Sequence, residues 1–407
     1  MASPKSRVCA VRVVGPLVPF AEGCAAKLRE RGYTPLTSVN LLRQVARLSR
    51  WLEASGVTAG ELTDARVDEF VAVQRAGERG RRSWSRTGLS CVLEVLREQG
   101  VVTAAVVPAP TSPSQVLLAC FERYLCSERG LSTGTARGYV RHAEQFVNGL
   151  AAGGLAEVTA PAVTAAVLRE AVGVSVSAAQ NFVFGLRAFL RFCFVEGLIG
   201  VDLSQAALPV TGRRRTLLPR GITPADGRAL LGSCDRRTPL GCRDYALLVV
   251  LLRLGLRRGE VAALTLDDID WRAGELVVRG KGGRQDRLPL PVDVGEAIAA
   301  YLRRGRPASN RREVFLRGRA PFDPIAAGTV ASTVRRACRR AGIAEVGSHR
   351  LRHTVACEMV AADVALTEIA QVLRHRSLQS TAIYARVDLD RLRTLAQPWP
   401  LNGGGSR

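Results

Sequence analysis

The sequence predicts a mainly α-helical protein, in which two helical segments precede an α+β segment with a small β-hairpin sheet. Three observations predict this class. Apolar residues make up 47 % of the 407 residues but aromatic residues only 5 %, so the cores must consist largely of Leu, Val and Ala, which favours helices over sheet sandwiches. Apolar residues recur at helical spacing in all three segments. Two short β-type stretches flank a glycine-rich turn at 280–283.

Proline-rich stretches divide the chain, whose length favours two or three domains. Three prolines fall within 108–113, and a second linker contains the run Gly212-Arg213-Arg214-Arg215, a basic strap suited to DNA phosphates. The predicted parts are a helical module at 1–106, a helical domain at 113–208, a basic linker at 209–222, a third domain at 223–396 and a tail at 397–407.

The first two segments resemble each other. Arg31-Gly32 and Arg129-Gly130 lie 98 residues apart, and at the same offset Arg43 matches Arg141. Apolar residues at helical spacing predict helices around 41–52, 139–150 and 182–193. We interpret the two segments as copies of one helical module, with chance similarity between Leu- and Ala-rich helices as the alternative.

The third segment begins with a helix start signal, Thr223 followed by Pro224. The spacing of apolar residues and the residues that start or stop helices predict helices at 224–232, 243–253, 259–264, 291–304 and 328–341. Strands are predicted at 275–279 and 284–290, on either side of the glycine turn. A mostly helical domain with a small sheet is therefore expected.

The charge distribution predicts a polyanionic partner. The net charge is +22, and residues 209–407 alone carry 35 Lys+Arg against 19 Asp+Glu, a net charge of +16. Only three of the 58 basic residues are lysines, a bias that indicates a GC-rich bacterial genome; a generally basic background is the alternative explanation of the charge. No apolar stretch is long enough to span a membrane, so we expect a cytoplasmic, nucleoid-associated protein whose polyanion is DNA.

Small basic and hydroxyl-bearing motifs gather in the third segment. They comprise Arg257 with Glu260, Lys281 on the hairpin turn, His349 with Arg352, His375, and Tyr384. Phosphoryl transfer explains this collection. Two arginines clamp the oxygens of the transition state, a tyrosine attacks as nucleophile, and a lysine can donate the proton that an arginine never releases.

A metal or other cofactor is not expected. The nearby carboxylates Asp363 and Glu368 lack ligand spacing relative to the histidines, and the cysteines form no Cys-x-x-Cys pair. Free thiols in a reducing compartment are the expected state of the cysteines.

The ordered set Arg257, Glu260, Lys281, His349, Arg352, His375 and Tyr384 resembles the catalytic set of the tyrosine recombinases, which include the phage integrases. The resemblance covers about 170 residues, from Thr223 to Ala396. It implies a tyrosine recombinase catalytic domain there and a helical, SAM-like core-binding domain at 113–208, which together form a C-shaped clamp around duplex DNA. The module at 1–106 would be a further DNA-binding unit.

The resemblance also implies a mechanism. Tyr384 attacks the scissile phosphate to form a 3′-phosphotyrosyl bond, while Arg257 and Arg352 hold the phosphate oxygens. Lys281 acts as general acid, His349 as base or proton relay, His375 hydrogen-bonds the phosphate and Glu260 supports the arginines. No ATP or metal is required. The protein would be a monomer or dimer off DNA and a homotetramer on two target duplexes, moving a phage, transposon or other mobile element.

Further arginines are predicted to contact DNA. Arg137 and Arg141 share one helix face and Arg187 and Arg191 another, and the linker contributes Arg213, Arg214 and Arg215. The family usually has Gly where this chain has Arg374, and we interpret Arg374 as an added DNA contact, with a solvated arginine as the alternative.

Two other functions are compatible with parts of this pattern. A type IB topoisomerase-like enzyme would use the same nucleophile without synapsis, and the modular first half argues against it. A catalytically silent DNA-binding regulator, or a structural nucleic-acid protein, would leave the complete residue set unexplained.

Overall fold

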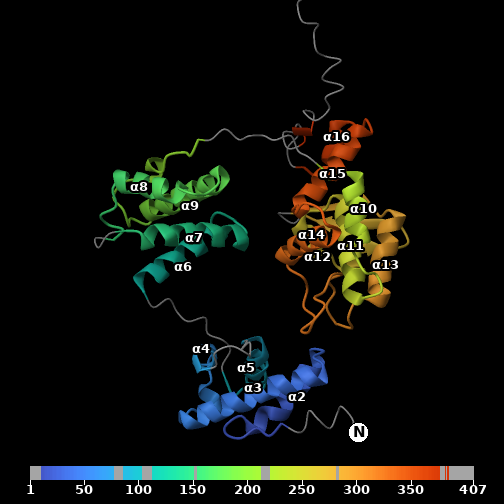
Figure 1. Ribbon diagram of the computed structural model, residues 1–407. Coiled ribbons are helices and arrows are strands. Elements are labelled where there is room, and N and C mark those ends of the chain that lie inside the picture. The colour runs from blue at the N-terminus through green and yellow to red at the C-terminus, as the bar shows by residue number, and fades with distance from the viewer. Residues whose placement is uncertain are drawn as a thin grey trace, which may run out of the picture. The chain divides into compact units, whose positions relative to one another are not determined.

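The structure is a computed structural model that describes residues 11–77, 86–102, 112–150, 154–211, 221–280, 284–375, 381, 383 and 384. The described residues form helices joined by short connections and a three-stranded antiparallel sheet, which confirms the predicted class (Figure 1). Lys281 and the arginines at 213–215 fall outside the described residues.

Contacts between Cα atoms divide the chain into two compact units, one of Ala104–Arg215 and one that combines Met1–Thr103 with Thr216–Arg407. The hydrophobic cores follow the three predicted segments more closely. One core lies within 17–102, a second within 117–210, and a larger core with a small satellite cluster within 222–384. The segment boundaries themselves stay a prediction.

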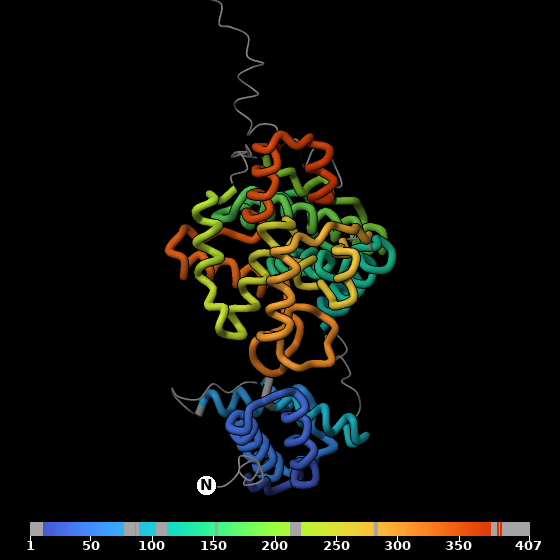
Figure 2. Tube along the Cα trace, turned by 90° about the vertical axis from the view of Figure 1, so that its right-hand side faces the viewer, coloured from blue at the N-terminus to red at the C-terminus, as the bar shows by residue number. Residues whose placement is uncertain are grey.

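The first segment is a helical bundle, drawn in blue in Figure 2. Its helices are α2 (Ala21–Glu30), α3 (Pro35–Ala54), α4 (Asp64–Gly77) and α5 (Arg86–Glu98), with short 3₁₀ turns η1 (Val18–Phe20) and η2 (Ala59–Glu61). Thr34 caps α3 by accepting a hydrogen bond from the Thr37 N–H, and Pro35 occupies the first helical position. Leu42, Val45 and Leu48 recur at helical spacing and are buried, so this face of α3 forms the core.

The second segment is also a helical bundle. It contains α6 (Pro113–Ser127), α7 (Thr133–Asn148), α8 (Ala160–Ala171), α9 (Val176–Val195) and the turn η3 (Ser204–Ala206). Helices α3 and α7 start 98 residues apart, and α4 and α8 start 96 apart, while the duplication of the module stays a prediction. The core is aromatic: the rings of Phe121 and Phe189 meet edge to face, with centroids 5.2 Å apart.

The third segment is built around α11 (Pro239–Leu254), which α10 (Pro224–Gly232), α13 (Val292–Arg304) and α15 (Ser348–Ala361) contact (Figure 1). The remaining helices are α12 (Arg258–Ala263), α14 (Ala327–Ala341) and α16 (Leu366–Val372), with the turn η4 (Leu266–Asp268). Helix α11 begins four residues before its predicted start, because Thr238 caps it with Pro239 at its first position.

The sheet consists of β1 (Ile269–Asp270), β2 (Glu275–Arg279) and β3 (Gln285–Pro289). Strands β2 and β3 pair antiparallel, with Glu275 opposite Pro289 and Arg279 opposite Gln285, so the two predicted strands form the expected pair. The two-residue strand β1 was not predicted, since it is too short to show a period. Helices of the described ranges are all too short or too polar to cross a lipid bilayer. The cysteines within those ranges form no disulfide bonds.

Candidate active site

Arg257 stands at the junction of α11 and α12. Helix α11 ends at Gly255, which adopts a left-handed conformation with φ of 57°, and a Cβ there would lie 3.0 Å from the Leu373 side chain. The chain then turns so that Arg257 is the N-cap of α12. Glu260, three residues on, accepts a hydrogen bond from the Arg257 backbone N–H at 2.8 Å. The Arg-x-x-Glu spacing is thus explained by a helix start.

The Glu260 carboxylate also holds the Arg257 side chain. Its Oε1 accepts a hydrogen bond from Arg257 Nη1 at 2.7 Å, and the Glu260 side chain is only 6 % exposed, whereas that of Arg257 is 44 % exposed. Burial opposes ionisation of Glu260, but the backbone N–H of Arg257 and the charges of Arg374 and Arg257 outweigh it and lower its pKa. The carboxylate therefore stays charged behind an arginine that remains open to a ligand.

Arg352 lies on the first half of α15 and is 1 % exposed. Its Nη1 donates to the Gly255 carbonyl at 2.6 Å and its Nη2 donates to the Leu373 carbonyl. Arg257 Nη2 donates to the next carbonyl, that of Arg374, at 3.2 Å. Two successive carbonyls after α16 therefore hold the two predicted catalytic arginines. Burial, with the charges of Arg257 and Arg374, lowers the pKa of Arg352 to about 10, so it remains cationic at neutral pH.

Tyr384 is buried, with 1 % of the residue exposed, and packs among Val355, Ile369 and Leu373. Its hydroxyl shares a hydrogen bond of 2.6 Å with Nδ1 of His353. Burial raises the pKa of Tyr384 to about 12, despite the opposing charge of Arg352. The phenol is thus neutral at physiological pH and needs a proton acceptor before it can attack.

Three histidines surround this tyrosine and the arginines. The ring of His353 meets that of His349 edge to face, with centroids 4.5 Å apart, and the ring of His375 lies parallel to that of Tyr384 at 6.5 Å. His375 Nδ1 also shares a hydrogen bond of 2.7 Å with the Thr381 hydroxyl. Burial, followed by neighbouring positive charges, lowers the pKa of His349 and lowers those of His353 and His375 to about 4. All three rings are therefore neutral at pH 7 and able to accept a proton.

His353 is the residue that sequence reasoning missed. The signal was available, because His349 and His353 are four residues apart and so share a helix face. Its contact with Tyr384, 31 positions away, was not available from spacing.

A basic cavity opens beside Arg257. It has a volume of about 580 Å³ and joins α12 to the hairpin; its lining residues are Arg257, Arg258, Gly259, Glu260, Arg279, Gly280, Arg284, Asp286 and Arg374. Gly280 and Arg284 are the nearest described neighbours of the predicted general acid Lys281 on either side. Gly280 and Arg284, the described residues on either side of the glycine turn, thus border the cavity that contains Arg257.

The structure buries Arg374 next to Glu260. It is 6 % exposed rather than solvated, and its Nη2 donates to Glu260 Oε2 at 2.7 Å while Nη1 donates to the Val372 carbonyl at 3.1 Å. The interpretation as a solvated arginine is wrong. Its guanidinium faces a carboxylate inside the domain, and the residue also lines the cavity beside Arg257.

Four of the other predicted DNA contacts lie on the second bundle. Arg137 and Arg141 are exposed on α7. On α9, Arg191 is exposed and 3.8 Å from the Asp202 carboxylate, whereas Arg187 is half-buried and its Nε donates to the Ala207 carbonyl at 2.9 Å. The arginine pair on α7 is therefore more accessible to DNA than the pair on α9. Within the described residues, no group of three or more His, Cys, Asp or Glu side chains is arranged to hold a metal ion.

Comparison with known proteins identifies the family of this chain. Residues 220–391 match the model of the phage integrase family. A putative integrase/recombinase of Sinorhizobium fredii, y4rA, is 40 % identical over 394 residues, which is 94 % of each chain. The tyrosine recombinase XerD of Mycobacterium tuberculosis is 34 % identical over 229 residues, 54 % of this chain and 72 % of XerD.

Solved structures share the fold. A lambda integrase dimer bound to a COC′ core site aligns with a TM-score of 0.53 and 18 % identity, covering 78 % of this chain and 90 % of that one. The XerH recombinase in a post-cleavage complex with palindromic difH aligns with a TM-score of 0.55 and 16 % identity, covering 82 % and 95 %. Through its family model and its full-length relative, the chain belongs to the phage integrase family and is a tyrosine-type site-specific DNA recombinase.

Proposed function

We propose that the protein cuts and rejoins DNA strands at a defined target site through Tyr384. The phenolic oxygen attacks the scissile phosphorus and displaces the 5′-oxygen, leaving a 3′-phosphotyrosyl ester and a free 5′-hydroxyl. The 5′-hydroxyl of a partner strand then attacks the ester and releases Tyr384, so the bond energy is conserved without ATP. The observation that carries this proposal is the fixing of Arg257 and Arg352 by the successive carbonyls of Leu373 and Arg374, on the segment that leads to Tyr384.

The side chains divide the chemistry between them. Arg257 and Arg352 neutralise the non-bridging oxygens, where charge develops in the transition state. Lys281 protonates the leaving 5′-oxygen and His375 hydrogen-bonds the phosphate. The proton of Tyr384 leaves through His353, which contacts its hydroxyl, and His349, whose ring contacts that of His353. Both rings are neutral at pH 7, as a proton acceptor must be, and their lowered pKa values make them weaker bases than a free imidazole.

Binding of DNA must uncover the nucleophile. Tyr384 is 1 % exposed here, so its oxygen cannot reach a phosphate without a shift of the segment that carries it. The 2.6 Å hydrogen bond between Tyr384 and His353 is therefore the contact to follow on DNA binding.

The partners are duplex target sites and further copies of the chain. We assign the second bundle as the core-binding domain, with Arg137 and Arg141 on its DNA face, and the basic linker at 209–222 to phosphates of the same duplex. Among the proteins that share the fold, lambda integrase is seen as a dimer on a core site and as a tetramer on a Holliday junction. A homotetramer on two duplexes, acting in the cytoplasm on a mobile element, is the assembly that supports strand exchange.

Covalent trapping on nicked DNA tests the proposal. A duplex with a nick near the cleavage point loses its short 5′-hydroxyl fragment, so the wild-type protein should accumulate as a DNA adduct. Tyr384→Phe should give no adduct and retain site binding within about threefold, because the ring keeps its packing and loses only the oxygen. An adduct at wild-type yield from the Phe variant would refute the assignment of the nucleophile.

Strand exchange between two duplexes separates the proposal from its alternatives. A recombinase joins strands from both duplexes, whereas a topoisomerase-like enzyme would form the adduct and relax supercoils without joining the duplexes. A silent regulator would bind the site and form no adduct.

A further inference from the structure

Arg374 is a buried cation with a specific partner. Its side chain is 4 % exposed and its Nη2 lies 2.7 Å from Oε2 of Glu260, whose own side chain is 6 % exposed. A charged side chain is rarely buried to this degree unless a carboxylate compensates it. Among the described residues, Glu260 is the carboxylate that pairs with it within 4 Å. The two groups thus form one buried unit beside the predicted phosphate-binding arginines.

This unit closes a ring with Arg257. Arg374 binds one oxygen of Glu260, the other oxygen binds Arg257 Nη1, and Arg257 Nη2 returns to the main-chain carbonyl of Arg374. Each member is therefore oriented by the other two. Without the Arg374 side chain, Glu260 Oε2 would keep only the Arg257 backbone N–H and Oε1 only Arg257 Nη1, so the carboxylate would lose its hydrogen bond to the segment after α16.

The backbone at Arg374 points to the same conclusion. Its φ is 53°, in the left-handed region, and within the described ranges the other non-glycine residue with positive φ is Asp363. An L-residue in this region is strained, and such strain persists where surrounding contacts fix it, commonly at functional sites. A glycine would adopt this conformation without strain, so the arginine at this position adds side-chain contacts at a conformational cost.

We propose that Arg374 is a positioning residue for the recombination reaction: by fixing Glu260, it orients the Arg257 guanidinium toward the scissile phosphate. Its own guanidinium is turned away from solvent, so it is not a DNA contact and not a catalytic residue. Arg257, with 44 % of its side chain exposed, is the member of the ring that meets the substrate. The inference rests on the proposed strand cleavage by Tyr384.

Single-turnover cleavage of a nicked duplex, with enzyme in excess, tests this role alongside DNA affinity from a binding titration. Arg374→Gly should slow adduct formation by roughly ten- to a hundredfold, the range expected when a catalytic group is slightly misplaced. Its dissociation constant for the duplex should stay within about twofold. Arg374→Lys keeps a charge that can reach Glu260 and should recover part of the rate.

A double-mutant cycle tests whether Arg374 acts through Glu260. Glu260→Gln removes the charge through which Arg374 is proposed to act, so Arg374→Gly should cost little further rate in that background. Fully multiplicative losses would overturn the proposal. The matched control is another buried arginine–carboxylate pair of this domain, Arg243 with Asp244, which are 2.8 Å apart; Arg243 also donates to the Leu316 carbonyl. Arg243→Lys should leave the rate unchanged at a temperature where the protein is folded.

The outcomes distinguish this inference from the proposed function. If the wild-type protein forms no adduct, the proposed function fails whatever Arg374 does. If the wild-type protein cleaves and Arg374→Gly cleaves equally fast, only the positioning role is wrong. If Arg374→Gly weakens DNA binding more than tenfold and leaves the cleavage rate of bound DNA unchanged, Arg374 is a DNA contact after all and the inference fails.

Discussion

At the scale of single residues, the arginines that we assign to the phosphate both donate to backbone carbonyls. Arg352 donates to the carbonyls of Gly255 and Leu373, and Arg257 donates to that of Arg374. Carbonyl groups of packed segments cannot rotate away as side chains can, so both guanidinium groups are prepared before a ligand arrives. The histidines are neutral before a ligand arrives, because burial lowers their pKa values.

The lysine of the hairpin should be irreplaceable by arginine. Lys281→Arg keeps the positive charge but loses a proton that can be transferred, so we expect cleavage to slow by about a hundredfold or more with duplex binding unchanged. A duplex with a 5′-bridging sulfur, whose leaving group needs no proton, should restore the rate. Equal rates for Lys281→Arg and the wild-type protein on ordinary DNA would exclude the general-acid role.

The buried histidines make stability sensitive to mild acid. The pKa values of His353 and His375 fall from about 6.5 in the unfolded chain to about 4 in the fold, so below pH 6.5 the unfolded state binds more protons. We expect the free energy of unfolding to fall as the pH drops from 6.5 to 5, where carboxylates are still largely ionised in both states. Urea denaturation at pH 7, 6 and 5 measures this slope.

The doubly substituted protein His353→Gln, His375→Gln is the control for that slope. Glutamine cannot bind the protons, so its stability should change less over the same interval. An identical slope in this variant would place the titrating groups elsewhere in the protein.

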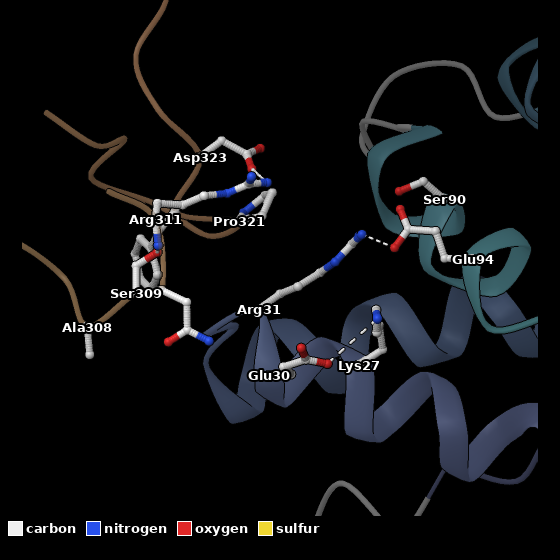
Figure 3. A pocket seen from close by; sticks show the side chains of 12 residues that line it. Lys27, Glu30, Arg31, Ser90, Glu94, Ala308, Ser309, Arg311, Pro321 and Asp323 are labelled. Carbon is white, nitrogen blue, oxygen red and sulfur yellow. Dashed lines mark hydrogen bonds and ion pairs between the residues drawn. The ribbon is translucent and has the colours of Figure 1, made fainter. Parts of the chain in front are cut away.

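At the scale of elements, α3 of the first bundle has two chemically different sides. Its apolar side forms the core, and the other side lines a groove of about 360 Å³ with Arg43, Arg47 and Arg50, joined by Arg12; Val11, Val39 and Ala46 complete the lining. None of these described lining residues is a carboxylate. Elsewhere in the same bundle cations face acids: Arg31 pairs with Glu94 and Lys27 with Glu30, as Figure 3 shows.

We expect the α3 groove to contact DNA phosphates. Arg43→Gln with Arg50→Gln should weaken duplex binding to a similar extent for specific and random sequences. The slope of log affinity against log salt should fall by about one for each phosphate that the variant no longer neutralises. Titration at several salt concentrations measures both effects. Arg86→Gln removes a charge that is paired with Asp64 and Asp68 in the same bundle, and serves as the control. A salt slope unchanged by the double substitution would exclude a phosphate contact there.

At the scale of the whole molecule, each of the three segments has its own hydrophobic core, and the proposed catalytic residues within the described ranges come from the third. A bundle that carries its own core can be removed without opening the core of another. The first segment is therefore expected to add binding rather than chemistry.

Deletion of residues 1–106 should shorten the DNA footprint and lower affinity, while the remaining 107–407 still cleaves a nicked core substrate. Footprinting of the full-length and truncated proteins at two salt concentrations measures this. An unchanged footprint would assign the first segment to protein–protein assembly, and loss of all cleavage would make it part of the catalytic clamp.

The helices, the hairpin, and the identity and order of Arg257, His349, Arg352 and Tyr384 could be predicted from the sequence alone. These features are local or chemical. The spacing of apolar residues indicates a helix, and the residue type limits the chemistry that a side chain can perform at phosphorus. The boundary errors were local too, such as the start of α11 and the two-residue strand β1.

How those residues act on one another depends instead on tertiary packing. Arg257 and Glu260 each contact Arg374 across more than 110 positions of sequence, and Tyr384 contacts His353 across 31. Such contacts follow from the packing of α11, α12, α15 and α16, which periodicity does not specify. For the same reason the sequence alone indicated that Arg374 lies at the DNA surface, whereas Arg374 is buried in the fold. The environment of a charged side chain depends on which other parts of the chain pack around it.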